Sequence, residues 1–354
     1  MLYNLLRPLL FSIPPETAHR LALNAAATLQ SLLPRGLPKA GRHQACTVMG
    51  VPFPNRVGLA AGLDKNAAYL EALARYGFGF LEVGTTTPKA QPGNPLPRLF
   101  RIPRAEALIN RMGFNNDGVD HLVDNVIRSA YRGILGINIG KNATTPIASA
   151  YIDYLLCMRS VYSYADYIVV NVSSPNTKNL RDLQQEEALA NLLRLLKAEQ
   201  ARLADDNGQY VPLVLKIAPD LEAEGIKRIA ELVVQHRFDG VVATNTTLER
   251  NAVLTLRHAE QSGGLSGAPL REMATEVIAQ LAQAFGGAIP IIGVGGIFSP
   301  QDAVEKLSAG ASLVQLYTGL IYRGPGLVRR IARHHLPDSL KCAASEPRQR
   351  PRRS

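Results

Sequence analysis

Amide, hydroxyl and lysine side chains recur through this sequence, each shortly after a short apolar run, and carboxylates are scarce among them. One such residue would usually mark only the start of a loop, but recurrence after six runs predicts a shared site. Asn presents a hydrogen-bond donor beside an acceptor, which matches the alternating N–H and C=O groups of a planar heterocycle. A lysine beside such a ring stabilises the negative charge that develops when the ring accepts a hydride. The residues are Asp64, Lys65, Thr85, Asn138, Asn171, Ser173, Ser174, Lys216, Thr244, Asn245 and Thr246.

Several other chemistries are disfavoured by what this set lacks. None of the seven His follows these runs, and no two His or carboxylates share an element at metal-ligand spacing, so no metal site is expected. No His is placed to activate Ser174 as in a Ser-His-Asp triad. The paired carboxylates of a glycosidase are also missing.

Glycine-rich segments follow the last two apolar runs, GVGGI at 293–297 and YTG at 317–319. Glycine lets backbone N–H groups approach phosphate oxygens, and barrel enzymes often hold phosphate after strands seven and eight. These two turns therefore predict a phosphate cradle. A further segment, GGLSG at 263–267, is expected to be a plain turn.

Eight apolar runs that read as strands alternate with helical patterns over about 290 residues, the arrangement of an α/β protein with a (β/α)₈ TIM barrel. A doubly wound open sheet is the alternative, but it usually opens with a glycine-rich dinucleotide turn, and the first run here leads into AAGLDK at 60–65. A small hairpin is expected at 46–53. The expected strands are 57–59, 80–84, 134–139, 167–172, 211–217, 240–244, 289–294 and 312–317, and the clearest helices are 67–76, 186–203, 221–236, 270–285 and 300–309.

Two amphipathic helices are predicted before the barrel. Leucines at positions 2, 5, 6, 9 and 10 form one helical stripe, which Pro8 should shorten or kink. Pro15 suits the first position of a second helix, which should end before Pro34. Such helices could lie in a membrane interface or pack on the main domain, and the sequence leaves both open. A signal peptide is not expected, because Arg7 and Pro8 break the early apolar run.

The net charge of +10 over 354 residues is concentrated at the two ends. Residues 1–45 and 341–354 each carry +4, which leaves +2 for the rest. A nucleic-acid-binding protein would more often place its basic residues on a folded face, so no nucleic acid is expected as a partner. The arginine-rich tail is predicted to be disordered. No run of 18 apolar residues predicts a membrane span, and the three separated cysteines suit a reducing compartment.

Eight ordered motifs are spread along the chain: GLAAGLDK (58–65), NRMGFN (110–115), GINIGK (136–141), NVSSPNT (171–177), KIAPD (216–220), ATNTT (243–247), GGLSG (263–267) and GVGGI (293–297). They resemble those of the dihydroorotate dehydrogenases, and the match runs over about residues 1 to 335. That family is a (β/α)₈ barrel with FMN that oxidises dihydroorotate to orotate in pyrimidine synthesis. Its soluble class has Cys in the loop after strand four and uses fumarate or a nicotinamide, whereas the quinone-dependent class has Ser and an N-terminal helical extension. Ser174 and the extension resemble the quinone class.

The resemblance implies roles for individual residues. Ser174 would abstract the C5 proton of dihydroorotate while the C6 hydride passes to the flavin, and Lys216 would sit near flavin N1 and O2. FMN would be bound by Ala61, Gly62, Leu63, Asp64, Lys65, Thr85, Asn138, Asn171, Lys216 and Thr244, with Gly267, Gly296, Tyr317 and Thr318 at its phosphate. Substrate would be bound by Lys65, the 110–114 backbone (Asn110, Arg111, Met112, Gly113 and Phe114), Asn171, Asn176, Asn245 and Thr246. His19, Arg101 and Tyr317 are candidates at the quinone head, although His19 could also be an ordinary surface residue.

These implications divide the chain into three parts: 1–42 as a membrane-associating helical segment with a quinone tunnel, 43–338 as the barrel, and 339–354 as the basic tail. The expected partners are dihydroorotate or orotate, a membrane quinone and an anionic membrane surface. The expected location is peripheral, on the cytoplasmic face of the cell membrane.

Two alternatives stay open at this point. One is another FMN barrel enzyme, such as a hydroxy-acid oxidase or an ene-reductase, disfavoured by the lack of His at strand ends. The other is a nucleic-acid-binding module that uses the two basic ends.

Overall fold

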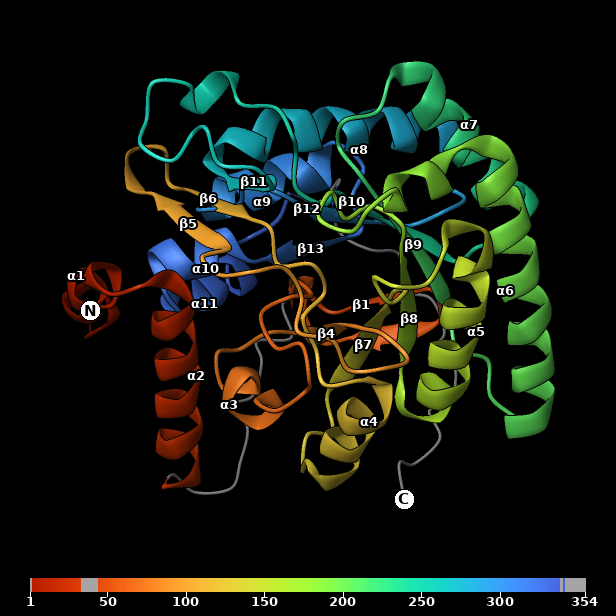
Figure 1. Ribbon diagram of the computed structural model, residues 1–354, viewed down its shortest axis with the longest axis horizontal. Coiled ribbons are helices and arrows are strands. Elements are labelled where there is room, and N and C mark those ends of the chain that lie inside the picture. The colour runs from red at the N-terminus through yellow and green to blue at the C-terminus, as the bar shows by residue number, and fades with distance from the viewer. Residues whose placement is uncertain (1, 33–43, 338–339, 341–354) are drawn as a thin grey trace.

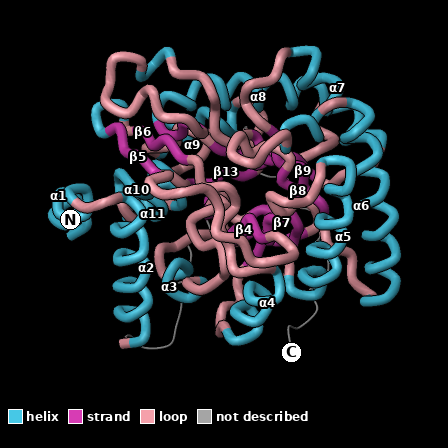
Figure 2. The backbone as a smooth tube through the Cα atoms, in the orientation of Figure 1, coloured by secondary structure: helices cyan, strands magenta, loops and turns pink. Residues whose placement is uncertain are grey.

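Eight parallel strands form a closed barrel at the centre of the protein, as the alternation of apolar runs predicts. The structure is a computed structural model that describes residues 2–32, 44–337 and 340. Neighbouring strands pair in the order β10-β12-β13-β3-β4-β7-β8-β9. Figure 2 shows these strands ringed by helices. The barrel strands are β3 (Val57–Leu59), β4 (Phe80–Thr86), β7 (Ile134–Ile139), β8 (Tyr167–Asn171), β9 (Leu213–Ile217), β10 (Gly240–Ala243), β12 (Ile291–Val294) and β13 (Leu313–Leu316).

Two strands begin two residues later than expected, and both differences involve proline. β9 starts at Leu213 and β12 at Ile291, each directly after a proline. Pro212 and Pro290 have no backbone N–H to donate to a neighbouring strand. Each still offers its carbonyl, which accepts from Ile168 N and Val241 N respectively. The apolar pattern therefore predicts the buried segment, and the proline determines the residue after which the strand can hydrogen-bond to both neighbouring strands.

Helices cover the outside of the barrel, most of them between consecutive strands (Figure 1). The five predicted helices are present, with shifted ends. The longest, α6, runs four residues past the expected end, to Asn207, and stops where Gly208 adopts a left-handed conformation with φ of 62°. The helices are α3 (Leu70–Ala74), α4 (Val119–Arg128), α5 (Ala150–Val161), α6 (Glu186–Asn207), α7 (Ala223–Gln235), α8 (Arg271–Phe285), α9 (Pro300–Ser308), α10 (Thr318–Arg323) and α11 (Gly326–Ala332).

One end of the barrel is closed by apolar packing. The predicted hairpin is present as β1 (Cys46–Val48) and β2 (Val51–Phe53). Phe53 packs edge-on against Phe80 with ring centroids 5.0 Å apart, and Tyr167 completes the cluster. Because this end is filled, polar side chains inside the barrel are directed toward the carboxyl ends of the strands, where barrel enzymes place their sites.

A second, antiparallel sheet lies over the barrel and was not predicted. It has the order β11-β6-β5, formed by β5 (Leu99–Ile102), β6 (Ala107–Asn110) and β11 (Gly264–Gly267). The GGLSG segment, expected to be a plain turn, supplies β11, so that expectation was wrong. Glycine has a low intrinsic preference for strands, and β11 forms because it pairs with β6, more than 150 residues earlier in the sequence.

Two helices precede the barrel, α1 (Leu2–Ser12) and α2 (Pro15–Ser31). Helix α1 continues through Pro8, so the expected shortening there does not occur, and Pro15 begins α2 as predicted. Helix α2 packs on the barrel side through Ala18 and Leu23, while Leu5 and Leu9 of α1 are 77% and 67% exposed. Figure 1 shows both helices at one edge of the molecule. Among the described helices, none combines the length and apolar content needed to cross a bilayer.

The basic residues that dominate the two ends fall mostly outside the described residues. The cations Arg35, Lys39 and Arg42 and the tail at 341–354 lie there, whereas the end of helix α2 at Ser31 is described and comes before Pro34, as predicted.

Candidate active site

A cavity at the carboxyl ends of the barrel strands collects most of the residues singled out in the sequence. It is bounded by the strand-end loops and by β11 of the covering sheet. The predicted residues that line it are Ala61, Gly62, Lys65, Thr85, Asn110, Met112, Gly113, Phe114, Asn171, Ser174, Asn176, Lys216, Thr244, Asn245, Thr246, Gly267, Gly296, Tyr317 and Thr318. Residues from widely separated parts of the chain thus converge on one site.

Buried amides and hydroxyls form a hydrogen-bonded layer beneath this cavity. Asn171 Nδ2 donates to Thr85 Oγ1 at 3.0 Å, and Thr85 Oγ1 donates to Asn138 Oδ1 at 2.6 Å. Asn138 does not line the cavity; its Nδ2 donates to Glu82 at 2.9 Å. The layer fixes the orientation of each amide, because every member is buried and has a partner.

Lys216 is a buried cation that reaches this cavity. Lys216 is on β9 and is 6% exposed. Within the described part of the chain, its side chain makes no hydrogen bond or ion pair. Burial lowers the pKa of Lys216, and the charge of Glu82 opposes that change. Two acceptors that line the same cavity, Gln315 Oε1 and Thr246 Oγ1, also have no hydrogen-bond partner among the described residues. A polar ligand with donors and acceptors would satisfy all three.

A turn after β3 presents Lys65. Asp64 does not line the cavity; its carboxylate accepts from the backbone N–H groups of Ala68 at 2.9 Å and Tyr69 at 2.8 Å. These hydrogen bonds stabilise the turn and lower the pKa of the carboxyl group. Burial has the larger effect and raises the pKa of Asp64 to about 6. Burial, with the charge of Arg98, lowers the pKa of Lys65 to about 8, and Glu16 acts in the opposite direction. Lys65 is therefore a cation whose charge depends on pH within the usual working range.

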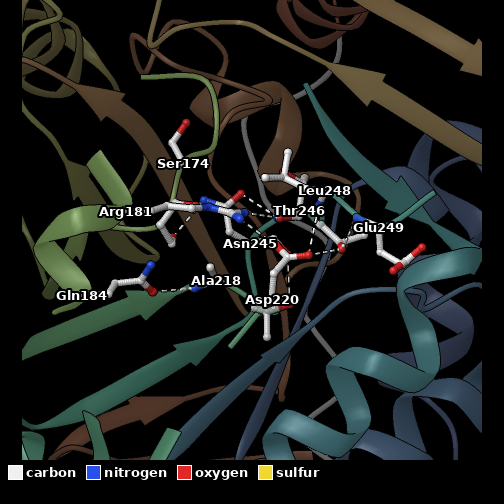
Figure 3. Close-up of polar contacts among 12 residues, drawn as sticks. Ser174, Arg181, Gln184, Ala218, Asp220, Asn245, Thr246, Leu248 and Glu249 are labelled. Atoms are coloured by element: carbon white, nitrogen blue, oxygen red, sulfur yellow. Dashed lines mark hydrogen bonds and ion pairs between the residues drawn. The ribbon is translucent and has the colours of Figure 1, made fainter. Parts of the chain in front are cut away.

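Ser174 lies in the loop after β8, beside the cavity. Asn171 Oδ1 accepts from the backbone N–H of Ser173 at 3.2 Å, an Asx-type turn that begins the loop. Ser174 Oγ accepts from Asn176 N at 3.3 Å, and within the described residues no histidine or carboxylate bonds to it. Figure 3 shows Ser174 beside the loop that carries Asn245 and Thr246. A base here would act without a neighbouring histidine.

The glycine-rich turns leave backbone accessible at the far side of the cavity. Gly296, after β12, has φ of 70°, and a Cβ there would overlap Arg271. Thr318 begins α10, and its hydroxyl lies 2.9 Å from that of Ser266 on β11. Position 296 therefore requires glycine for both conformation and space.

The three candidate quinone residues are placed differently. Tyr317 lines the cavity and also a neighbouring cavity of about 680 Å³ between α2 and the barrel. His19, Leu63 and Asp64 line that second cavity, and burial lowers the pKa of His19 to about 4. Arg101 lines neither; its guanidinium donates to two backbone carbonyls at the α1–α2 corner, at 3.2 and 2.8 Å.

Arg111 also points away from the cavity, in keeping with an expectation that concerned only its backbone. Its guanidinium donates to Gln261 at 2.9 Å and to the Pro97 carbonyl at 2.8 Å.

Some lining residues were not singled out individually. Val294, Gly295, Ile297 and Gly319 belong to the two glycine-rich turns predicted as a phosphate cradle, whereas Ala60, Ser266, Leu270, Gln315 and Leu316 had no predicted role. Gln315 and, deeper in the barrel, Glu82 could have been found, since each is a lone polar residue inside an apolar strand. Ser266 could not, because the covering sheet was not predicted.

The family model for dihydroorotate dehydrogenase matches residues 44–340. The chain belongs to the dihydroorotate dehydrogenase family. A relative from Nitrosospira multiformis, named dihydroorotate dehydrogenase (quinone), is 60% identical over 333 residues, which cover 94% of this chain and 95% of that protein. A relative of the same name from Nitrosomonas eutropha is 58% identical over 350 residues, covering 98% and 99%.

Solved structures of dihydroorotate dehydrogenase (DHODH) from Eimeria tenella share the fold. The complex with ferulenol has a TM-score of 0.84 and 38% identity, covering 90% of this chain and 89% of that one. The ligand-free form has a TM-score of 0.83 and 39% identity, with coverages of 90% and 93%. The predicted family and barrel are therefore confirmed. Membership in the dihydroorotate dehydrogenase family makes the chain an oxidoreductase, in place of the nucleic-acid-binding alternative.

Proposed function

We propose that this protein oxidises dihydroorotate to orotate, with bound FMN as hydride acceptor and a membrane quinone as final electron acceptor, in pyrimidine biosynthesis. The observation that carries the proposal is the single cavity that brings Ser174, Lys216 and the strand-end amides together in a chain of this family. The relatives named quinone-dependent support the electron acceptor.

The residues present fit a flavin. The buried, unpartnered Lys216 suits the pyrimidine edge of an isoalloxazine, where negative charge accumulates on reduction. Gly267, Gly296, Tyr317 and Thr318 would hold the phosphate, and the ring and ribityl chain would lie among Ala61, Gly62, Lys65, Thr85, Asn171 and Thr244, whereas Leu63, Asp64 and Asn138 do not line this cavity. When bound, FMN supplies the site that accepts a hydride from the substrate. We assign Asn138 and Asp64 indirect roles, since they support the lining residues from behind.

Substrate would lie between the flavin and the Ser174 loop. Lys65 would pair with its carboxylate, and Asn110, Asn171, Asn176, Asn245 and Thr246 would hydrogen-bond the ring, together with the 110–114 backbone. Ser174 would take the C5 proton. A serine hydroxyl is a weak base near neutral pH, so its own proton needs an exit. Thr177, on the same loop, is buried, and its hydroxyl has no partner in the described part of the chain, which supports an exit along this loop.

The second cavity would admit the quinone. Tyr317 borders both cavities, so a quinone head beside it would lie close to the flavin. His19 would be neutral at pH 7, given its pKa of about 4, and could donate or accept a hydrogen bond. Arg101 would act by holding the α1–α2 corner in place rather than by contact with the quinone.

Function is tested by the visible spectrum of the purified protein. Anaerobic dihydroorotate should bleach a flavin spectrum, and a ubiquinone analogue should restore it. Restoration by fumarate or NAD but not by the quinone would contradict the electron acceptor, and absence of flavin would contradict the whole proposal.

The pH dependence of orotate binding should follow Lys65. The lysine is charged below its pKa of about 8 and neutral above it, so the Kd of orotate should be flat near neutral pH and rise as pH passes 8, by up to about tenfold per pH unit. Glu16 raises that pKa, so Glu16→Gln should move the rise to lower pH, whereas Glu276→Gln, on the exposed face of α8, should not. Fluorescence titration of the flavin with orotate measures both; a Kd independent of pH would contradict the role of Lys65.

Membrane association should depend on the exposed face of α1, which we propose rests on the cytoplasmic face of the cell membrane. Leu5 and Leu9 expose 77% and 67% of their surface, and burying a leucine contributes about 1.5–3 kcal/mol. The double variant Leu5→Glu, Leu9→Glu should bind vesicles of phosphatidylcholine and phosphatidylglycerol at least about tenfold more weakly than the parent. Leu156→Glu, at a 43% exposed position on α5, is the matched control. Co-sedimentation measures the difference, and equal binding of all three would contradict the proposal.

A further inference from the structure

Arg181 joins the loops that follow three neighbouring barrel strands, β8, β9 and β10. The loops after β8 and β10 line the cavity, although Arg181 itself does not. It belongs to a short 3-10 helix (Leu180–Gln184) that follows the Ser174 loop. Its Nε donates to the Ser173 carbonyl at 3.1 Å and its Nη2 to the Thr246 carbonyl at 2.9 Å. Its Nη1 pairs with Asp220 at 2.8 Å. Figure 3 shows Arg181 beside Thr246 and Asp220. The three partners Ser173, Thr246 and Asp220 belong to the loops after β8, β10 and β9.

Asp220 extends the same connection. Its second carboxylate oxygen accepts from the hydroxyl of Thr247 and from the backbone N–H of Leu248 at 3.0 Å. Arg181 and Asp220 are 20% and 22% exposed, so water screens the pair only in part. Hydrogen bonds from a charged group are stronger than those between neutral groups. The two members of the ion pair therefore hold the loop after β10 at different residues: Arg181 bonds to Thr246, and Asp220 bonds to Thr247 and Leu248.

A second contact fixes the same 3-10 helix. Gln184 Oε1 accepts from the backbone N–H of Ala218 at 3.0 Å, in the loop after β9. The bond from Arg181 back to Ser173 also brings together the two ends of the segment 174–180. A loop whose ends are held together is compact. Ser174 is the first residue of this closed segment.

We propose that Arg181, paired with Asp220, is a positioning residue for the proposed reaction: it holds the Ser174 loop and the Asn245–Thr246 turn in register, so that the base and the ring-binding amides face one substrate. This inference rests on the proposed function. Arg181 acts through two backbone carbonyls, one directly before Ser174 and one on Thr246, whose side chain lines the cavity. A displacement of about 1 Å of a reacting group can cost about 100-fold in rate.

The order of the strands in the barrel places Arg181 and its partners away from the cavity proposed for the quinone. In the closed order, β9 lies four strands from β3 in either direction, and β3 leads into the turn of Lys65 that borders the second cavity. Loss of Arg181 should therefore slow the oxidation of dihydroorotate and spare the reoxidation by quinone. A general loss of structure would affect both half-reactions.

The test uses the holoenzyme in stopped-flow measurements of the two half-reactions. Arg181→Met should slow flavin bleaching by saturating dihydroorotate about 30- to 100-fold, with flavin content and quinone reoxidation within about twofold of the parent. Arg181→Lys should recover part of the rate, and Asp220→Asn, which keeps the shape of the side chain, should be intermediate. Arg228→Met removes an exposed ion pair with Glu186 and is the matched control, expected to be unchanged.

A double-mutant cycle distinguishes positioning from a structural role. If Arg181 acts by placing the Ser174 hydroxyl, Arg181→Met should slow bleaching less than about threefold in a Ser174→Ala background, because the group it positions is already gone. The same loss in both backgrounds, or unchanged bleaching in Arg181→Met, would overturn the inference. Failure of the parent to bleach at all would instead overturn the proposed function.

Discussion

Ser174→Ala should slow the bleaching of the flavin by dihydroorotate by about 10²- to 10⁴-fold, the range that a positioned base contributes. The substitution removes only the Oγ atom, which accepts one hydrogen bond, from Asn176 N at 3.3 Å. The amide layer beneath the cavity does not bond to this hydroxyl, so its orientation should persist. Orotate, the product, has already lost the proton that the base removes, so it should still bind with a Kd within about threefold of the parent.

The measurement is anaerobic stopped-flow bleaching together with orotate titration on the same preparations. Ser163→Ala is the matched control, since Ser163 is an exposed serine whose hydroxyl bonds Asn207 away from the cavity. Equal bleaching rates in the parent and in Ser174→Ala would refute Ser174 as the base. A large loss of orotate affinity in Ser174→Ala would show that the hydroxyl binds substrate rather than removing its proton.

The barrel could be predicted from the sequence because each strand is buried on both faces. A parallel strand inside a barrel reads as a continuous apolar run, and all eight runs became strands at or near the expected positions. The covering sheet could not be predicted in this way. Its strand β11 has glycine at both ends, Gly264 and Gly267, and β5 contains Arg101. These segments become strands only through pairing partners far away in the sequence.

The site was predictable where it follows strand ends and less so elsewhere. Ser174, Lys216 and Asn245 come directly after or at the end of strands, and the closure of the barrel brings them to one cavity. The sequence around each polar residue does not indicate which polar residues contact one another behind the residues that line the cavity. Arg181 and Asp220 are 39 residues apart on different loops, and no periodicity connects them.

Lys216→Met should have opposite effects on stability and on flavin binding. In the flavin-free protein the variant replaces a buried cation that lacks a hydrogen bond or ion pair among the described residues, so the free energy of unfolding should rise by about 1–3 kcal/mol. Glu82 is not left unsatisfied by the change, because Asn138, Tyr167 and Gln315 all donate to it. FMN should bind at least about tenfold more weakly, since its pyrimidine edge loses a charged partner.

The gain in stability should also depend on pH. Burial lowers the pKa of Lys216 in the folded protein. The free-energy cost of burying its charge is therefore present in full below the folded-state pKa. This cost falls as pH rises from the folded-state pKa toward the pKa of the unfolded chain. The advantage of Lys216→Met should therefore be largest near neutral pH and shrink at alkaline pH. Urea unfolding of flavin-free parent and variant at both conditions measures this difference.

Lys306→Met provides a control of opposite sign. Lys306 is also fully buried, but its ammonium donates to the Arg271 carbonyl at 2.5 Å and to the hydroxyl of Thr275. Its removal takes away two hydrogen bonds from a charged donor, although the Arg271 carbonyl keeps its bond from the Thr275 hydroxyl, so the free energy of unfolding should fall by about 1–3 kcal/mol. If Lys216→Met lowered stability in the same way, the lysine would be satisfied by the protein alone. A gain for Lys216→Met beside a loss for Lys306→Met would instead show that Lys216 is kept charged in the barrel for a ligand.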